Sequence, residues 1–449
     1  MMKCGIFAIF LAIHCVIAAK ANADDTFFSP TLKTEALGLN WGASFNHRTR
    51  LEATGEIGPP GRSQIAALMR TGFHVHVGRG AAYLGGELLD ARYYNLTSAD
   101  FGRVPVDEAA NAVEPVQFYV GAQFDDIFGR GVSLNARAGR LTLDIGSGRL
   151  IGRRRFRNTV QTFMGGELLA RHGDLQMRAF GVRPVRANCG SFTNGIEVDR
   201  LLDLRGYNFG VHLQKNRLAF IDATVELYLF GERLNFPASG LRSFLSFTPG
   251  LRLSRPSKLG AFDFDFEAAT NFAEVELDVL FQSPIPPGDV FFFREAFGTF
   301  GYFFHAEAGR TFDAPFSPRL GLVFDIGSGP GNDFLTRFRV TQSDFDLSRR
   351  QPAAFGSRAR LYDDFGPASA SAIYAPFRIR GSSFGIDGSN IISPGAVFSA
   401  DAFGKISIKS SYRYFWREDA LIFDEFETPQ DFSKLSRKEQ MTTLVIKWT

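Results

Sequence analysis

The segment from Lys405 to Arg417 separates cations from apolar and aromatic side chains. Its sequence is KISIKSSYRYFWR, and its cations recur every fourth residue at Lys405, Lys409, Arg413 and Arg417. The alternate positions hold isoleucine, tyrosine and tryptophan, at Ile406, Ile408, Tyr412, Tyr414 and Trp416. Successive side chains of a β-strand point to opposite faces, so a strand here would have one cationic and one apolar, aromatic-rich face. That pattern is typical of a strand between lipid and a water-filled interior, and it predicts a charged pore.

The start of the chain predicts export from the cytoplasm. Lys3 precedes an apolar run from Gly5 to Ala19, and small residues lead to Asp24. We interpret residues 1–23 as a secretory signal peptide and exclude them from the fold. Without them Cys189 is the only cysteine, so the exported chain cannot form an internal disulfide.

The charge balance excludes a general nucleic-acid binder. Lysine and arginine number 50, of which forty are arginine, against 47 aspartate and glutamate residues, which gives a formal net charge of +3. A protein that neutralises many phosphates needs a large basic excess, so we predict no nucleic-acid partner. Arginine binds carboxylates and phosphates through a planar fork, and any charge selectivity must therefore be local.

Period-two alternation recurs along the chain and sets the fold class. It is clear at 207–214, 221–229, 262–267 and 319–326, where every second residue is apolar. The other face of these strands, which would point toward water, carries both acidic and basic residues. We predict an all-β fold, a transmembrane antiparallel up-and-down β-barrel, and a single domain over residues 24–449. The last strand, 440–449, would pair with the first, near 36–50, and remove the edges that lipid cannot satisfy.

Connector lengths alternate between short and long. Short connectors are expected at 79–81, 172–174, 216–217, 255–258 and 403–404. Long connectors are expected at 51–68, 97–112, 146–159, 187–204, 231–240 and 417–439. Outer-membrane barrels have short periplasmic turns and longer outside loops. Sixteen strands have clear signals, and an extra pair around 354–362 and 370–378 would make about eighteen, which we prefer because a structureless loop over 329–390 would be unusual.

One segment resembles a known family. Residues 139–166 read GRLTLDIGSGRLIGRRRFRNTVQTFMGG, which resembles the hallmark of the alginate-export family of outer-membrane channels. Matching positions are Gly139, Arg140, Gly146, Ser147, Gly148, Arg149, Leu150, Arg157, Asn158, Phe163 and Gly165, whereas Gln161 and Met164 depart from the pattern. Residues 309–329 and 412–418 resemble the family as well. The resemblance implies a barrel of about eighteen strands that passes an acidic polysaccharide, or smaller solutes in broader relatives.

The predicted pore residues are cations. Besides the four in the opening segment, Arg137, Arg178 and Arg319 are expected to face inward, and the resemblance adds Arg140. Passage of a polyuronate needs cations that attract the chain without trapping it. The alternative is that these cations only pair with inner acids, for which Asp222, Glu226, Asp263, Asp265, Glu267, Glu307 and Asp325 are available.

A second group of cations lies in the long connector at 146–159. Arg149, Arg153, Arg154, Arg155 and Arg157 occur there with no acid among them. Because long connectors alternate with short periplasmic turns, this long connector is expected at the extracellular mouth, where a positive field could guide anions. The alternative is that it bridges phosphates of surface glycolipid.

Signals for other chemistry are weak. His74 and His76 lie two apart without an evident third ligand, so we predict no metal site and no cofactor. The segment 327–332 lacks the Gly-Lys-Ser/Thr ending of a phosphate loop. We therefore do not expect an enzyme.

The sequence favours an anion channel in the outer membrane of a Gram-negative bacterium. Its expected solute is an alginate-like, uronate-containing polysaccharide leaving the periplasm, and its expected partners are outer-membrane lipid, the anionic polysaccharide or a small anionic solute, and periplasmic export components. One alternative is a general or nutrient-uptake porin on the same barrel. Another is a structural or receptor barrel plugged by residues 329–390.

Overall fold

The computed structural model describes most of the expected strands. The described residues are 32–36, 39–54, 64–95, 111–127, 129–152, 160, 162–186, 200–201, 207–218, 221–235, 241–282, 290–327, 391–402, 406–415 and 439–448. The expected signal peptide and the expected strands within 329–390 lie outside them. Among the described residues, no helix is long and apolar enough to cross a membrane.

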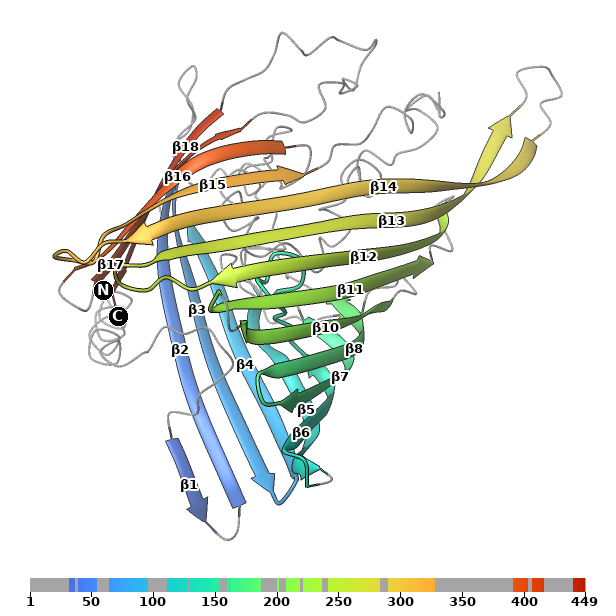
Figure 1. The fold of residues 1–449 in the computed structure, drawn as a ribbon. Coiled ribbons are helices and arrows are strands. Elements are labelled where there is room, and N and C mark those ends of the chain that lie inside the picture. The colour runs from blue at the N-terminus through green and yellow to red at the C-terminus, as the bar shows by residue number, and fades with distance from the viewer. Residues whose placement is uncertain are drawn as a thin grey trace, which may run out of the picture.

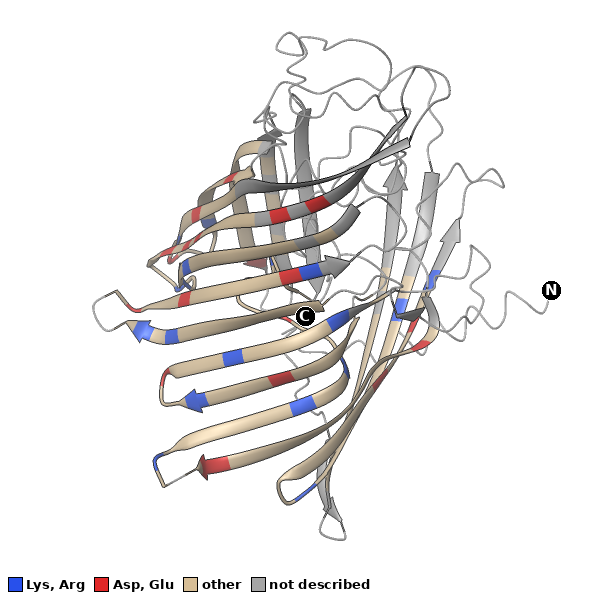
Figure 2. Ribbon diagram, turned by 90° about the vertical axis from the view of Figure 1, so that its right-hand side faces the viewer, with Lys and Arg blue, Asp and Glu red and all other residues tan. Residues whose placement is uncertain are grey.

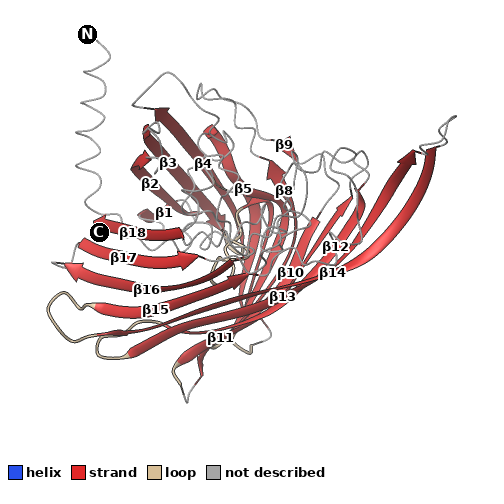
Figure 3. Cartoon of the chain, turned by 90° about the horizontal axis from the view of Figure 1, so that it is seen from above, coloured by secondary structure: helices blue, strands red, loops and turns tan. Residues whose placement is uncertain are grey.

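The described residues form one antiparallel sheet (Figure 1). Its strands in chain order are β1 (Leu32–Ala36), β2 (Leu39–Thr54), β3 (Gln64–Arg79), β4 (Ala82–Asn95), β5 (Asn111–Ile127), β6 (Val132–Leu141), β7 (Thr162–His172), β8 (Leu175–Arg186), β9 (Arg200–Leu201), β10 (Tyr207–Leu218), β11 (Ala223–Asn235), β12 (Leu241–Arg255), β13 (Phe262–Gln282), β14 (Val290–Thr311), β15 (Arg319–Gly327), β16 (Ile391–Ala402), β17 (Ile406–Phe415) and β18 (Glu439–Trp448). Seen from above, the sheet curves rather than lying flat (Figure 3).

Each long strand pairs with the next long strand along the chain, as an up-and-down sheet requires. The pairing runs from β2 to β8, passes to β10, and continues to β18, while the two-residue β9 pairs with the end of β8. β15 pairs directly with β16 over its whole length, from Arg319 opposite Ser399 to Gly327 opposite Ile391. Both edges of β15 are thereby occupied, one by β14 and the other by β16.

Burial along the strands is inverted relative to a water-soluble protein. In β10 the apolar Phe209, Val211 and Leu213 are exposed, whereas Asn208 and His212 are almost completely buried. The same holds in β15, where Leu322 is 71% exposed and Asp325 only 7%. We call the apolar side the outer face and the polar side the inner face. An outer face of this kind requires lipid around it, because water would not tolerate so much exposed apolar surface.

The connections at one end of the strands are short. Examples are residues 80–81 between β3 and β4, 173–174 between β7 and β8, and 403–405 between β16 and β17. Two expected long connectors are shorter than predicted because strands extend into them. β2 continues to Thr54, β3 begins at Gln64, and β11 continues to Asn235. We call the end with the short turns the short-turn rim.

Glycines on the strands make room for aromatic rings. A Cβ added at Gly85 would lie 2.3 Å from the Tyr119 ring, and one at Gly250 would lie 2.2 Å from the Tyr228 ring. Tyr228 in turn stacks on Phe230, with ring centroids 4.7 Å apart. The rings therefore lie over the glycine backbone, an arrangement that fixes the register of neighbouring strands.

Candidate functional site

Polar residues on successive strands line up in one row across the inner face. Glu226 of β11 pairs in register with Arg252 of β12, Arg252 with Glu267 of β13, Glu267 with His305 of β14, and His305 with Asp325 of β15. We call these five residues the polar row. Figure 2 shows that basic and acidic residues are interspersed over the described strands. Directly paired residues share a face, so the row forms a continuous charged band.

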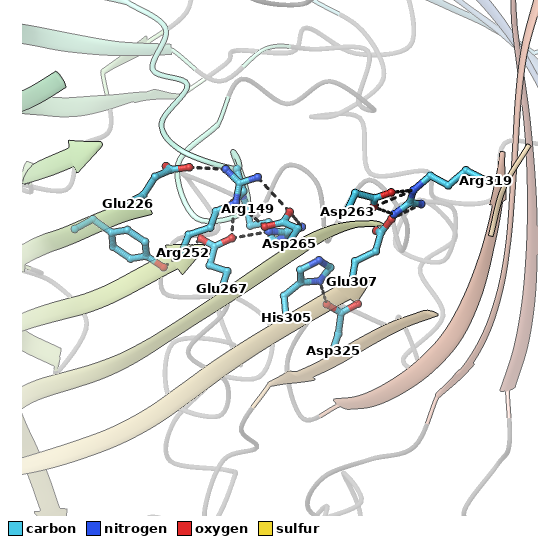
Figure 4. Close-up of polar contacts among 12 residues, drawn as sticks. Arg149, Glu226, Arg252, Asp263, Asp265, Glu267, His305, Glu307, Arg319 and Asp325 are labelled. Carbon is cyan, nitrogen blue, oxygen red and sulfur yellow. Dashed lines mark hydrogen bonds and ion pairs between the residues drawn. The ribbon is translucent and has the colours of Figure 1, made fainter. Parts of the chain in front are cut away.

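Arginines join the carboxylates of this band into a network (Figure 4). Arg252 donates to Glu226 at 2.6 Å through Nη1 and to Asp265 at 2.7 Å through Nε. His212 contacts the other oxygen of Glu226 at 2.7 Å. Each carboxylate is largely removed from water and is held by at least one charged donor, which offsets the cost of burying it.

The connection between β6 and β7 reaches this network from elsewhere in the chain. Arg149 donates to Glu267 at 2.7 Å and to Asp265 at 2.8 Å, and Ser147 Oγ donates to Glu267 at 2.6 Å. Burial lowers the pKa of Arg149, but the adjacent Asp265 and Glu267 carboxylates outweigh that effect and raise it above its ordinary value. The guanidinium is therefore permanently charged, and it fixes the loop to the inner face of β13.

The tip of this connection is a small hairpin, which we call the inner loop (residues 142–152). Ile145 N donates to the Ile151 carbonyl at 3.0 Å, and Gly148 N donates to the Ile145 carbonyl at 3.0 Å. Gly146 and Gly148 have φ of +59° and +72°, and a Cβ at Gly146 would lie 2.7 Å from a Glu226 carboxylate oxygen. Glycine is therefore required both by the backbone conformation and by the close approach to β11.

Two of the predicted pore arginines hold the base of the inner loop. Arg137 pairs with Glu167 at 2.8 Å and donates to the Thr142 carbonyl at 3.3 Å. Arg178 donates to the Asp144 carbonyl at 2.7 Å. Both arginines are buried on the inner face, and both bind protein groups rather than solvent.

The other two predicted pore arginines, Arg140 and Arg319, also contact carboxylates. Arg140 donates to Glu114 at 2.5 Å and to Thr162 Oγ1 at 3.1 Å. Arg319 forms a bidentate ion pair with Asp263, in which Nε lies 2.9 Å from a carboxylate oxygen. Its Nη1 lies 2.9 Å from the Glu307 carboxylate. His305 and Asp325 lie 2.5 Å apart nearby. Pairing with inner acids, the alternative reading of these cations, is therefore what the structure has for Arg137, Arg140 and Arg319.

Backbone register extends the band toward the cationic segment of the sequence. Arg319 is paired with Ser399, and Ser399 with Lys409, so positions 319 and 409 lie in one cross-strand row. Position 413 lies in the row that contains Asp265, Glu307 and Gly395. Lys405 and Arg417 lie outside the described residues, as do Arg153, Arg154, Arg155 and Arg157.

The position of Arg149 differs from the prediction. Connector parity placed its loop at the extracellular mouth, but in the structure Arg149 lies against inner-face carboxylates. The physical reason is the apolar content of the inner loop, because Leu143, Ile145 and Ile151 are almost completely buried and a loop in water would expose them. That apolar content was the signal in the sequence that could have indicated the inward fold.

Several functional neighbours escaped the sequence analysis. Arg252, His212, Glu167 and Tyr228 were not singled out, although Tyr228 donates to Glu267 at 3.1 Å. His74 lies 3.3 Å from Tyr119, and His76 contacts the Tyr83 ring. Within the described part of the chain, no three His, Cys, Asp or Glu residues are grouped to hold a metal ion.

An antiparallel sheet with a lipid-facing outer side and a charged inner side defines the class of outer-membrane channel proteins. The sequence matches the model for alginate export over residues 38–423, most of its length. The chain therefore belongs to the alginate-export family, and it is an outer-membrane channel of a Gram-negative bacterium. A comparison with curated proteins found no match.

The comparison with solved structures found proteins of two bacteria, among others. OccAB1 of Acinetobacter baumannii is 11% identical, with 84% of this chain and 80% of that chain covered and a TM-score of 0.47. OccK8 (OprE) of Pseudomonas aeruginosa is 11% identical, with 84% and 83% covered and a TM-score of 0.41. OccK2 (OpdF) of Pseudomonas aeruginosa, solved in complex with glucuronate, is 11% identical, with 84% and 80% covered and a TM-score of 0.41.

Proposed function

We propose that this channel conducts an anionic solute, and that the solute is an alginate-like, uronate-containing polysaccharide leaving the periplasm. The observation that carries the proposal is the pairing of Arg319 with Asp263 and Glu307 on the inner face. A uronate carries the same carboxylate group as these two side chains. The guanidinium is therefore already arranged for the ligand that a polyuronate would present.

Pairing with protein acids also explains how such a channel avoids trapping its cargo. A passing carboxylate must displace Asp263 or Glu307 from Arg319, so the net gain on binding is small. Conduction requires binding that is favourable at entry and weak enough for exit. An exchange of one carboxylate for another meets both requirements.

The inner loop supports passage control at the same level of the channel. Arg149 bridges Asp265 and Glu267 next to the carboxylates that Arg252 holds. Because the loop is fixed by exchangeable ion pairs, carboxylates of the cargo would compete for Arg149 as well. The loop would then move while the polymer passes.

The proposal includes a closed barrel formed by residues 24–449, with residues 1–23 removed on export. Eighteen strand segments occur in the described sheet, and subtracting the short β1 and β9 leaves sixteen long strands. Closure would bring β18 to β2. About sixteen strands enclose more space than side chains can fill, which leaves an aqueous interior.

The test is reversal potential and single-channel conductance of the purified protein in a planar bilayer across a salt gradient, with and without oligouronate. We expect anion preference and block by oligouronate, both weakened when Lys409, Arg413 and Arg417 are changed together to glutamine. The matched control changes Arg130, Arg217 and Lys258 to glutamine, which removes the same charge from exposed positions at the short-turn rim.

Each other outcome has a definite meaning. Weakly selective conductance that oligouronate does not affect would identify a general or nutrient-uptake porin instead. No conductance from folded protein would indicate a plugged barrel. Equal effects of the two triple variants would show that net charge, rather than a cationic path, sets the preference.

A further inference from the structure

Arg310 is an exposed cation on the outer face of β14. It pairs in register with Phe262 of β13 on one side and with Leu320 of β15 on the other. Phe262 is 64% exposed and Leu320 56% exposed, and both belong to the apolar outer face. Arg310 is the second-last residue of β14, so it lies one residue from the turn that leads to β15. It therefore sits at the short-turn rim of the lipid-facing surface.

The surroundings of Arg310 differ from those of the arginines on the inner face. Arg137, Arg140, Arg149, Arg252 and Arg319 each contact a carboxylate. Arg310 instead lies over two aromatic rings, with its guanidinium carbon 5.1 Å from the centre of Phe262 and 5.7 Å from that of Phe312. Within the described residues it makes no ion pair, and the nearby Asp313 is itself exposed and not paired with it.

Hydrogen bonds hold the turn after β14, which contains Phe312 and Phe316, in a fixed conformation. Phe312 N donates to the Pro318 carbonyl at 2.8 Å, and Asp401 N donates to the Phe316 carbonyl at 2.8 Å. Phe316 adopts φ of +69°, an uncommon conformation for a bulky residue, and its side chain is half exposed. A strained turn that displays phenylalanines at the end of an apolar surface is suited to the interface between lipid and water.

A cation in this position needs a counter-charge. Lipid packed against the outer face would exclude water from around Arg310, and an unpaired charge removed from water is costly. We propose that Arg310, Phe262 and Phe312 form a binding site for the phosphate headgroup of a phospholipid in the periplasmic leaflet. The guanidinium would bind the phosphate oxygens, while the two rings would pack against the glycerol and the upper acyl chain.

The position of the site along the strands indicates that the bound lipid belongs to the periplasmic leaflet. Short turns of outer-membrane barrels face the periplasm, and Arg310 lies beside such a turn. The other described outer-face arginine that lies over a ring, Arg183, contacts Tyr207 at the opposite end of the strands. The site is therefore separate from the inner face and does not depend on which solute the channel conducts.

Native mass spectrometry of the full-length folded protein in detergent tests the site. The probe is phosphatidylglycerol, and diacylglycerol with the same acyl chains is the phosphate-free reference. We expect the wild type to retain phosphatidylglycerol preferentially and Arg310→Gln to bind it about fivefold more weakly, as expected for one cation near an anionic lipid surface. Arg310→Lys should fall between them, because it keeps the charge but loses the planar contact with the rings.

Arg130→Gln is the matched control, since it removes the same charge from an exposed turn at the same rim that lacks this aromatic pair. Phe262→Ala with Phe312→Ala should weaken binding while keeping the cation. Equal phosphatidylglycerol retention by the wild type and Arg310→Gln would overturn the proposal, and so would equal losses in Arg310→Gln and Arg130→Gln. Heat-modified mobility in electrophoresis verifies that each variant is folded.

Discussion

Arg149 and Glu267 are 118 residues apart in the sequence, and their side chains meet at 2.7 Å. One comes from a loop and the other from the wall, so their contact determines whether the inner loop lies across the inner face. Both side chains are largely buried, with 11% and 3% of their surface exposed. Removing one partner of a buried ion pair costs more free energy than the intact pair contributes, because the other charge remains buried without a partner.

We therefore expect Arg149→Gln to release the inner loop. Loss of a buried partner costs about 3 kcal/mol, which is enough to shift a docked loop to a mostly undocked one. Single-channel recordings should show a larger mean conductance and more current noise than the wild type.

Arg252→Gln is the control for this variant. It disrupts the wall pairs with Glu226 and Asp265 but leaves the Arg149 contact with Glu267 in place. If both variants raise the conductance to the same extent, wall charge rather than loop release is responsible.

Removing the acids around Arg319 should increase anion preference. Asp263→Asn with Glu307→Gln leaves the Arg319 guanidinium without its two carboxylates, so its field extends into the lumen. The reversal potential across a salt gradient should shift toward that of chloride. Asp222→Asn with Asp313→Asn removes two acids from exposed turns and should shift it much less.

The packing of Tyr228 over Gly250 predicts a large effect of one methyl group. A Cβ at Gly250 would lie 2.2 Å from the ring, so Gly250→Ala must displace Tyr228 from its stack on Phe230. Overpacking of this kind costs about 1–3 kcal/mol. Urea unfolding of the protein in detergent should show this loss of stability for Gly250→Ala. Gly181→Ala, whose added Cβ would have nothing within 4 Å, should leave the stability nearly unchanged.

The ion pair between Asp222 and Lys258 at the short turns predicts a pH dependence. The hydrogen bond from Lys258, and then its charge, lower the pKa of Asp222 from its ordinary 3.8. A carboxylate with a depressed pKa stabilises the folded state above its unfolded-state pKa and loses that effect as pH falls through the folded value. Wild type and Lys258→Gln should therefore differ slightly in urea midpoint at neutral pH and converge as the pH drops below about 3.8. A difference that grows on acidification would contradict this.

The faces of the strands were predictable from the sequence because side-chain period alone sets them. Phe209, Val211 and Leu213 lie outward and Asp263, Asp265 and Arg319 inward, as the alternation indicates. The strand ends were less predictable. Residues 51–54 and 64–67 were expected to belong to a long connector, yet they pair with each other and extend the hairpin of β2 and β3.

The polar row and the inner loop could not be derived from the sequence. A row depends on the register between strands, and register depends on turn lengths and bulges such as the one between Lys215 and Leu218. The loop depends on carboxylates that come more than 100 residues later. The arginine-rich connector at 146–159 singled out Arg149 as a candidate cation, but only its contacts with Asp265 and Glu267 show that it holds the inner loop.

The length of β13 and β14 has a consequence for how the protein would open. These strands have 21 and 22 residues, so the longer spans about 75 Å along its axis, whereas a tilted strand needs far less to cross an apolar band of about 25 Å. β12 pairs with β13 only as far as Leu277, and β15 pairs with β14 only from Phe303 onward. Beyond those points no other described strand pairs with β13 or β14, so the two form a two-stranded ribbon, which is marginally stable in water. Backbone amides at its far end should exchange with deuterium first, and unzipping should begin there while the strands within the bilayer remain paired.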